Sequence, residues 1–168
     1  MKRSSIFIFI VALLLSFSGC SEGVGRMKTP ADFFYCRSNV SFDTQNGVIT
    51  SERRETADFT DDLAALVNHY LQGPISSHLR SPFPENSAVL WISSSDSELI
   101  LVMNPQFTQL TDLDLSLACT CLCKTLFQLS QVDRITIRGL GDTIDEQATI
   151  VITRDSVLLW DENVKPVS

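Results

Sequence analysis

The stretch that decides the fold runs from Thr111 to Leu129 and has the sequence TDLDLSLACTCLCKTLFQL. On a helix, at 100° per residue, six of its side chains fall within one apolar arc. These are Leu115, Ala118, Cys119, Leu122, Leu126 and Leu129. Thr111 and Asp114 have the spacing of a capping box, so the helix should begin at Thr111. We therefore predict a helix over 111–129 with Leu122 at the centre of its buried arc.

The opposite side of this helix is also apolar. It carries Leu113, Leu117, Cys121 and Phe127, interrupted by Thr120, Lys124 and Gln128. Two interpretations remain open. Leu113, Leu117 and Phe127 are a candidate partner surface, or this side is covered by the chain's own opening strands or closing hairpin, as is common for a helix that is apolar all round.

Three cysteines in this helix, at 119, 121 and 123, suggest a metal or redox site at first sight. Helical geometry points Cys119 and Cys121 about 200° apart, so the three thiols cannot meet on one ion. Free cysteine is among the most buried residue types, which favours core packing. We predict no metal site, and the sequence leaves open whether any of these thiols pairs with Cys36.

Before this helix, the sequence predicts two strands, a helix and a hairpin. The opening strands are Asp32 to Cys36 and Gly47 to Arg53. The first helix should be capped by Thr60, with Asp61 and Asp62 in its first turn, and should end at Gly73-Pro74. Its apolar face holds Leu63, Leu66, Val67, Tyr70 and Leu71. Three prolines make 73–84 an irregular connection, and the hairpin pairs Ala88–Ile92 with Leu99–Met103.

After the helix, strict alternation predicts a strand over Val132–Arg138. A closing hairpin is expected from Thr149–Ile152 and Val157–Trp160. This order predicts an α+β two-layer sandwich, with two helices on one face of a mixed or antiparallel sheet and an added C-terminal hairpin.

The first twenty residues resemble a bacterial lipoprotein leader. Lys2 and Arg3 precede ten apolar residues over 6–15, and small residues then lead to Cys20 in the manner of a lipobox. We predict a signal peptide over 1–19, a diacylglycerol on Cys20, a flexible tether over 20–30 and one domain over 31–168. Two acyl chains hold a protein stably on the extracytoplasmic face of the cell membrane. The alternative is an ordinary cleaved signal in which Cys20 has no role.

Composition, charge and the absence of catalytic motifs limit the classes of function that we expect. The chain has 168 residues, 44% hydrophobic and 20% charged, which suits one globular domain. Its net charge of −7 is unfavourable for binding a phosphate backbone, so no nucleic-acid partner is expected. The two histidines, His69 and His78, should both be solvated, and neither a G-x-S-x-G elbow nor a complete phosphate loop occurs. We predict that the protein is not an enzyme and has no cofactor.

The run from Thr60 to Gly141 resembles the GerMN domain, the sporulation and spore-germination domain of bacterial membrane lipoproteins. The resemblance rests on the order and spacing of five segments: Leu71-Gln72-Gly73-Pro74, Val89-Leu90-Trp91-Ile92, Leu99 to Phe107, Lys124-Thr125-Leu126-Phe127 and Val132 to Ile137. Two features depart from the family. Residues 101–105 read LVMNP where Val-Asp-Leu-Ser is common before the Phe, and the cysteine trio is not expected.

The resemblance implies a non-catalytic module for protein–protein assembly in sporulation or spore germination. The partners it implies are other envelope or sporulation proteins, or copies of itself in a homo-oligomer or ring. The alternative is a small extracytoplasmic enzyme directed at the cell wall, or a ligand-binding lipoprotein, built on His69 or His78. A pocket that joins either histidine to a carboxylate would favour that alternative.

Overall fold

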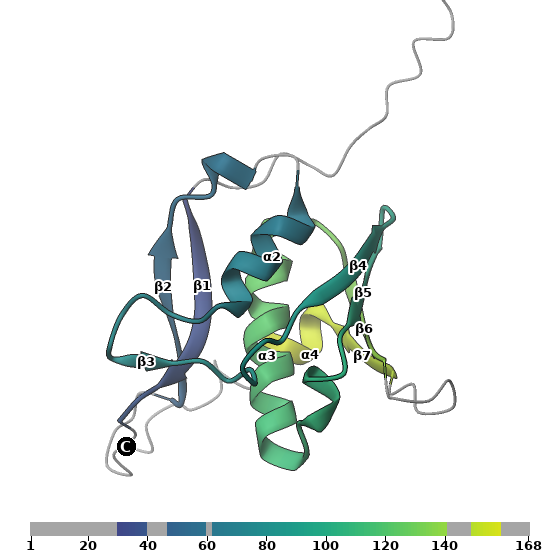
Figure 1. The fold of residues 1–168 in the computed structure, drawn as a ribbon. Coiled ribbons are helices and arrows are strands. Elements are labelled where there is room, and N and C mark those ends of the chain that lie inside the picture. The colour runs from purple at the N-terminus through teal and green to yellow at the C-terminus, as the bar shows by residue number, and fades with distance from the viewer. Residues whose placement is uncertain (1–29, 40–46, 60–61, 141–148, 159–168) are drawn as a thin grey trace, which may run out of the picture.

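The computed structural model describes residues 30–39, 47–59, 62–140 and 149–158 (Figure 1). The α-helices are α2 (Leu63–Leu71), α3 (Asp112–Leu129) and α4 (Arg154–Leu158), and short 3-10 helices cover Ala57–Phe59 and Phe107–Gln109. The strands are β1 (Ala31–Arg37), β2 (Ile49–Arg54), β3 (Leu79–Arg80), β4 (Val89–Ser94), β5 (Glu98–Met103), β6 (Arg134–Gly139) and β7 (Thr149–Thr153).

The strands form two sheets, and α2 and α3 lie between them (Figure 1). One sheet has the order β4-β5-β6-β7, in which β5 and β6 run parallel and the other pairs run antiparallel. The second has the order β2-β1-β3 and is antiparallel. The α+β class and the mixed sheet are confirmed. The difference is that the opening strands lie on the far side of the helices as a separate sheet.

Helix α3 is buried on more than one side, which explains its sequence. Ala118, Cys121 and Leu122 are fully buried, although Cys121 was assigned to the opposite side from Leu122. The strand β1 lies along one side of α3 and α4 packs near its C-terminal end. The chain's own opening strand therefore covers the second apolar side, as one of the two interpretations held.

Side chains of α3 bind the open edge of β1. Strand β3 pairs with β1 only at Cys36 and Arg37, so the edge at Asp32 and Phe34 has no strand partner. The Gln128 amide fills this gap, since it accepts from the backbone N–H of Asp32 at 3.2 Å and donates to the carbonyl of the same residue. The Thr125 hydroxyl accepts from the N–H of Phe34 at 3.0 Å. Backbone groups that would otherwise be buried without partners are thereby satisfied.

Helix α2 makes the same kind of contact with the other sheet. The Asn68 amide accepts from the N–H of Val89 at 2.8 Å and donates to the Val89 carbonyl at 3.2 Å, at the edge strand β4. On the other side of α2, the Tyr70 hydroxyl donates to the carbonyl of Phe34 in β1. One edge in each sheet is therefore held by polar side chains from the helices between the sheets.

The ends of α2 correct one prediction and confirm another. Asp62, not Thr60, is the N-cap, because its carboxylate accepts from the N–H of Ala65 at 2.8 Å; Thr60 lies outside the described residues. The helix ends at Gly73 as predicted. Its φ of 105° is left-handed, a conformation that glycine adopts at little cost.

The start of α3 differs from the predicted capping box. Thr111 occupies the N-cap position with extended backbone, but its side chain makes no capping hydrogen bond. Asp112 has a left-handed φ of 50°, which short polar residues tolerate better than most. At the other end, the Arg154 guanidinium donates to the carbonyls of Phe127, Ser130 and Val132, at 2.9, 3.0 and 2.7 Å. These bonds fix the C-terminus of α3.

The predicted closing hairpin is wrong in its second half. Strand β7 forms and pairs with β6, but Arg154–Leu158 is helical where Val157–Trp160 was expected to return as a strand. Two local contacts explain the turn into a helix. The Ser156 hydroxyl bonds both the N–H and the carbonyl of Thr153, and the Arg154 side chain is anchored on α3. Leu159 and Trp160 lie outside the described residues.

We predict that Leu122→Glu unfolds the domain, because it would bury a carboxylate without a partner at a fully buried position. The expected loss is about 3–5 kcal/mol, a large part of the stability of a single domain. Chemical denaturation of the purified full chain measures it. Leu113→Glu, on the same helix but at a 69% exposed position, is the matched control and should change stability by about 0.5 kcal/mol or less. Equal losses in both variants would contradict the assigned orientation of α3.

Candidate interaction surface

The face of the four-stranded sheet that points away from the helices carries an open row of apolar side chains. The strand register places Trp91 opposite Val102, and Val102 opposite Arg138. In the next row, Ile100 lies beside Thr136, which lies beside Val151. The rows share a face because directly paired residues, and residues two apart on one strand, point to the same side. We call this surface the outer sheet face.

The outer sheet face combines exposed apolar side chains with basic ones. Trp91 is 54% exposed and Val151 56% exposed, and Figure 1 shows none of the described elements covering this face. Arg134 and Arg138 lie on it, whereas the chain as a whole has a net charge of −7. Such an open apolar area with basic neighbours is typical of a protein interaction surface.

The carboxylate on this face, Glu98, is held in an ion pair. Thr136 donates to it at 2.6 Å, and the Arg134 Nε lies 3.3 Å from its Oε1. The hydrogen bond from Thr136, followed by the nearby arginines, lowers the pKa of Glu98. Glu98 therefore stays ionised at neutral pH and orders the side chains at one end of the face.

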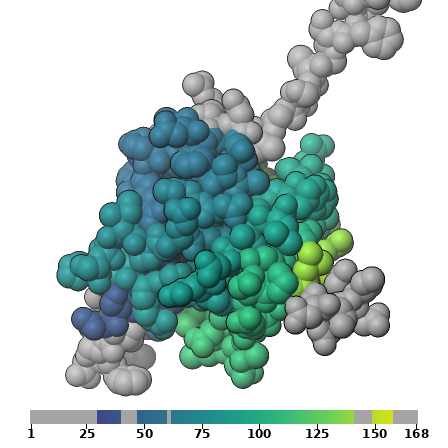
Figure 2. Space-filling model, viewed as in Figure 1, coloured from purple at the N-terminus to yellow at the C-terminus, as the bar shows by residue number. Residues whose placement is uncertain are grey.

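The three residues of the predicted partner surface on α3 do not lie together. Leu113 is 69% exposed, between the exposed Asp112 and Asp114, in the first turn of the helix. Figure 2 shows this region, in green, at the surface of the molecule. Leu117 is half-buried and packs against the core. Phe127 is 6% exposed and lies 4.9 Å beneath the Arg154 guanidinium. Phe127 is therefore unavailable to a partner, and a role for Leu113 stays a prediction.

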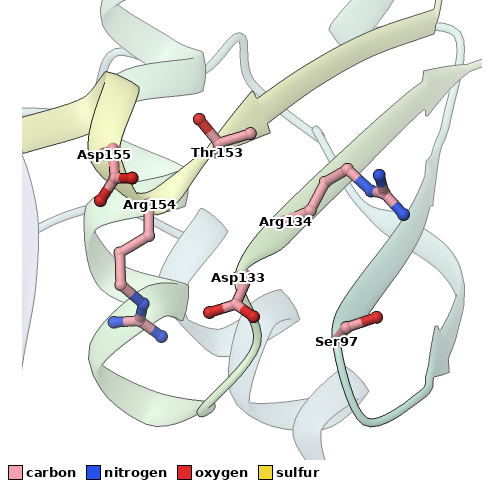
Figure 3. Close-up of a pocket in the computed structure, with 6 residues that line it drawn as sticks. All are labelled: Ser97, Asp133, Arg134, Thr153, Arg154 and Asp155. Carbon is pink, nitrogen blue, oxygen red and sulfur yellow. The ribbon is translucent and has the colours of Figure 1, made fainter.

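One depression, of about 360 Å³, lies where β6 and β7 meet the hairpin of β4 and β5. Its lining is Ser97, Asp133, Arg134, Thr153, Arg154 and Asp155 (Figure 3). The two arginine side chains point in different directions, Arg134 along the sheet and Arg154 toward α3. Arg154 is engaged by three carbonyls and Arg134 by Glu98. These side chains do not converge on a common point where a reaction could take place.

The histidines lie apart from this depression. His69 and His78 are both exposed, as predicted, and His69 stacks on Phe59 with ring centroids 5.3 Å apart. A second depression of about 360 Å³, formed near Leu71 and Pro84, includes neither histidine. The described part of the chain holds no group of three His, Cys, Asp or Glu residues placed to bind a metal ion. Its four cysteines are all buried.

A buried charged cluster that the sequence did not reveal joins β2 to the end of α2. The guanidinium of Arg54 pairs with Glu52 and donates to the carbonyl of Gly73 at 2.7 Å and to the hydroxyl of Tyr35 at 3.0 Å. Glu52 also accepts from the backbone N–H groups of Ile75 and Ser76, both at 2.9 Å. Every member has partners within the fold, so the cluster serves to fix the sheet on the helix.

Taken together, these elements define a class of domain. The elements α2, β4, β5, α3 and β6 follow one another as helix, hairpin, helix and parallel strand, the same order of segments on which the resemblance to the GerMN domain rests. No convergent catalytic cluster occurs among the described residues.

Solved structures support this assignment. The chain is similar to the tandem GerMN domains of the sporulation protein GerM from Bacillus subtilis, with 21% identity and a TM-score of 0.51 over 73% of this chain. It spans 43% of that structure, less than half its length. The first GerMN domain of the same protein is similar over 76% of this chain and 99% of its own length, with 16% identity and a TM-score of 0.53. At these identities the likeness shows the fold. Family models and curated protein sequences give no match.

Glu52 should make stability depend on pH. Burial alone would raise its pKa, but the N–H groups of Ile75 and Ser76 and the Arg54 guanidinium outweigh burial and lower it. A lowered pKa in the folded state contributes stability above the ordinary value of 4.5 and loses it as the pH falls through the folded value. We expect Glu52→Gln to lose about 2 kcal/mol at pH 7, with the gap to wild type closing below about pH 4.5.

Thermal unfolding at a series of pH values tests this expectation. Glu55→Gln is the control, because it removes the same charge from an exposed neighbour and should leave the pH profile unchanged. A constant difference between wild type and Glu52→Gln across the acid range would contradict the assignment.

Proposed function

We propose that this chain is a lipid-anchored, extracytoplasmic assembly module that acts in sporulation or spore germination and binds another domain of the same fold. The observation that carries the proposal is the outer sheet face. It presents Trp91 and Val151 to solvent among arginines on a fold shared with domains of a sporulation protein. No described depression joins a histidine to a carboxylate, so no observation favours the enzymatic alternative.

The occupant proposed for the outer sheet face is a second copy of the chain, which would dock the start of its α3 there. In that turn, Leu113 is exposed between Asp112 and Asp114, so an apolar side chain is flanked by two carboxylates. The outer sheet face offers the complement, an apolar row flanked by Arg134 and Arg138. The fold also occurs in tandem in the solved GerM structure.

The two complementary surfaces lie on different parts of the molecule, the lower end of α3 and the outer face of the sheet (Figure 1). Contacts of this kind are heterologous, because each copy uses two different patches. They generate rings when the rotation between copies closes and filaments when it does not. Envelope proteins with the same acidic and apolar pattern are further candidate partners.

Anchoring rests on the leader, whose residues lie outside the described part of the chain. No helix in the described part combines the length and apolar character needed to cross a bilayer. The proposed attachment is a diacylglycerol on Cys20, with 20–30 as a tether between the lipid and the domain.

We expect radiolabelled palmitate to enter the wild-type protein and not Cys20→Ala, because the cysteine sulfur is the proposed site of acylation. Labelling is measured in a bacterial host that processes lipoproteins, with Cys36→Ala as the control that keeps the leader intact. Equal labelling of wild type and Cys20→Ala would remove the lipid anchor from this proposal.

Trp91→Glu should fold normally and weaken self-association at least tenfold, because it replaces an exposed aromatic side chain of the outer sheet face by a carboxylate. Sedimentation velocity of the purified full chain over a concentration series measures the association. Asp112→Lys should also weaken self-association, since it reverses a charge on the other proposed patch.

Ile75→Glu is the matched control for this experiment. Ile75 is 79% exposed, more than Trp91, but lies in the connection after α2 and away from both patches. It should associate as the wild type does. A wild type that stays monomeric at every concentration, or an Ile75→Glu effect as large as that of Trp91→Glu, would refute docking between copies on the outer sheet face.

A further inference from the structure

Three side chains of α3 approach β1 at regular intervals along the strand. Gln128 meets Asp32 and Thr125 meets Phe34 through hydrogen bonds to the strand backbone. The next step of two residues along the strand reaches Cys36, and the next turn of the helix reaches Cys121. Two residues of a strand advance about 6.6 Å, and three to four residues of a helix advance about 5–6 Å. Successive contacts between β1 and α3 are therefore spaced almost equally along both elements.

Cys36 and Cys121 make the third contact of this series. The Cys121 thiol hydrogen-bonds to the Cys36 sulfur, and both residues are fully buried. The two residues come from elements whose backbones approach closely along their length. Close backbones and facing side chains are what a disulfide requires.

We propose that Cys36 and Cys121 form a disulfide in the exported protein and so link the β2-β1-β3 sheet covalently to α3. This inference rests on the proposed extracytoplasmic location, where disulfides form and persist. The structure holds both residues as thiols, so it describes the reduced form of the pair.

The step is a thiol–disulfide exchange with a disulfide oxidant, either a small disulfide or an oxidoreductase that carries one. The Cys36 thiolate attacks a sulfur of the oxidant and releases one of its thiols as a mixed disulfide forms. The Cys121 sulfur, as its thiolate, then attacks Cys36 and releases the second thiol. Two protons and two electrons leave the pair, and the oxidant is reduced to two thiols.

The environment of the four described cysteines favours this pair. The hydrogen bond from Cys121, helped by Arg80, lowers the pKa of Cys36 in spite of burial, which makes Cys36 the better nucleophile. Burial raises the pKa of Cys119 to about 12 and raises that of Cys123 as well. Because both partners are fully buried, the bond should form while β1 docks on α3 during folding.

The test refolds the full chain, in a Cys20→Ala background, from denaturant with a mixture of oxidised and reduced glutathione. Trypsin should then release residues 29–37, which hold Cys36, linked to residues 81–124, which hold the other three cysteines. Because the second peptide contains three candidates, single variants identify the partner. Cys121→Ala should abolish the link, whereas Cys119→Ala and Cys123→Ala should retain it.

A second measurement distinguishes a disulfide from two thiols that are only packed against each other. Reduction should lower the Tm of the refolded protein by about 10 °C, because the bond closes a long loop. The Cys36→Ala and Cys121→Ala double variant should show no change on reduction. Four free thiols after refolding, or a link that survives Cys121→Ala, would overturn the proposal.

Blocking free thiols in living cells before lysis tests the proposed extracytoplasmic location independently, because it preserves the redox state of the pair. The protein made with its leader should carry the Cys36–Cys121 bond at the moment of lysis. Efficient bridging in the refolding experiment, combined with reduced thiols in cells, would support the pair and count against the extracytoplasmic location. Failure of the refolding experiment alone would leave palmitate labelling and self-association unaffected.

Discussion

The structure depends on one constraint, the need to satisfy the open edges of two sheets that are not joined to each other. On the side of β1 opposite β2, no described strand pairs with Asp32 or Phe34, and β4 is an edge strand at Val89. The missing ladder bonds come from helix side chains, Gln128 and Thr125 on α3 and Asn68 on α2. An unpaired buried amide costs free energy comparable to a lost hydrogen bond, so these polar side chains set where the helices lie.

This arrangement explains why α3 is apolar nearly all round. A helix that covers one sheet needs a single apolar stripe, but a helix between two layers needs apolar residues on both. One of its buried cysteines, Cys121, meets Cys36 of β1. The two ends of α3 differ in their surroundings. Leu113 in the first turn is exposed, whereas the C-terminus is hydrogen-bonded by Arg154. The exposed end therefore remains free for the proposed docking, while the buried end stabilises the fold.

The outer sheet face follows from the same layering. Because the helices occupy only the inner face of the β4-β5-β6-β7 sheet, alternate residues of each strand are left on the side away from the core. Among the polar residues on that side, Trp91, Ile100, Val102 and Val151 are apolar. A surface of this composition is favourable once a partner removes it from water. The proposed assembly therefore uses the face that the fold itself leaves uncovered.

Local patterns determined much of this molecule. The 3.6-residue period of 111–129, the alternation of 132–138 and Gly73 at the end of α2 each predict an element from neighbouring residues, and the structure confirms all three. The exposure of His69 followed from its position off the apolar face of its helix, and that of His78 from its place in the proline-rich connection. The alternation in RITIR even places Arg134 and Arg138 on one face, although the sequence gives no indication of which residues lie beside them.

Only the tertiary structure decided the rest, because those features depend on contacts between distant parts of the chain. The sequence contains both Cys36 and Cys121 but does not give the register that brings β1 against α3. It places Glu52 and Arg54 at the end of β2 and Gly73 after α2, and only packing joins them into one buried cluster. The closing segment forms α4 because the Arg154 side chain bonds to α3. Strand propensity takes no account of such a long-range contact. Local period is encoded in adjacent residues, whereas layer order and pairing are set by the free energy of the whole fold.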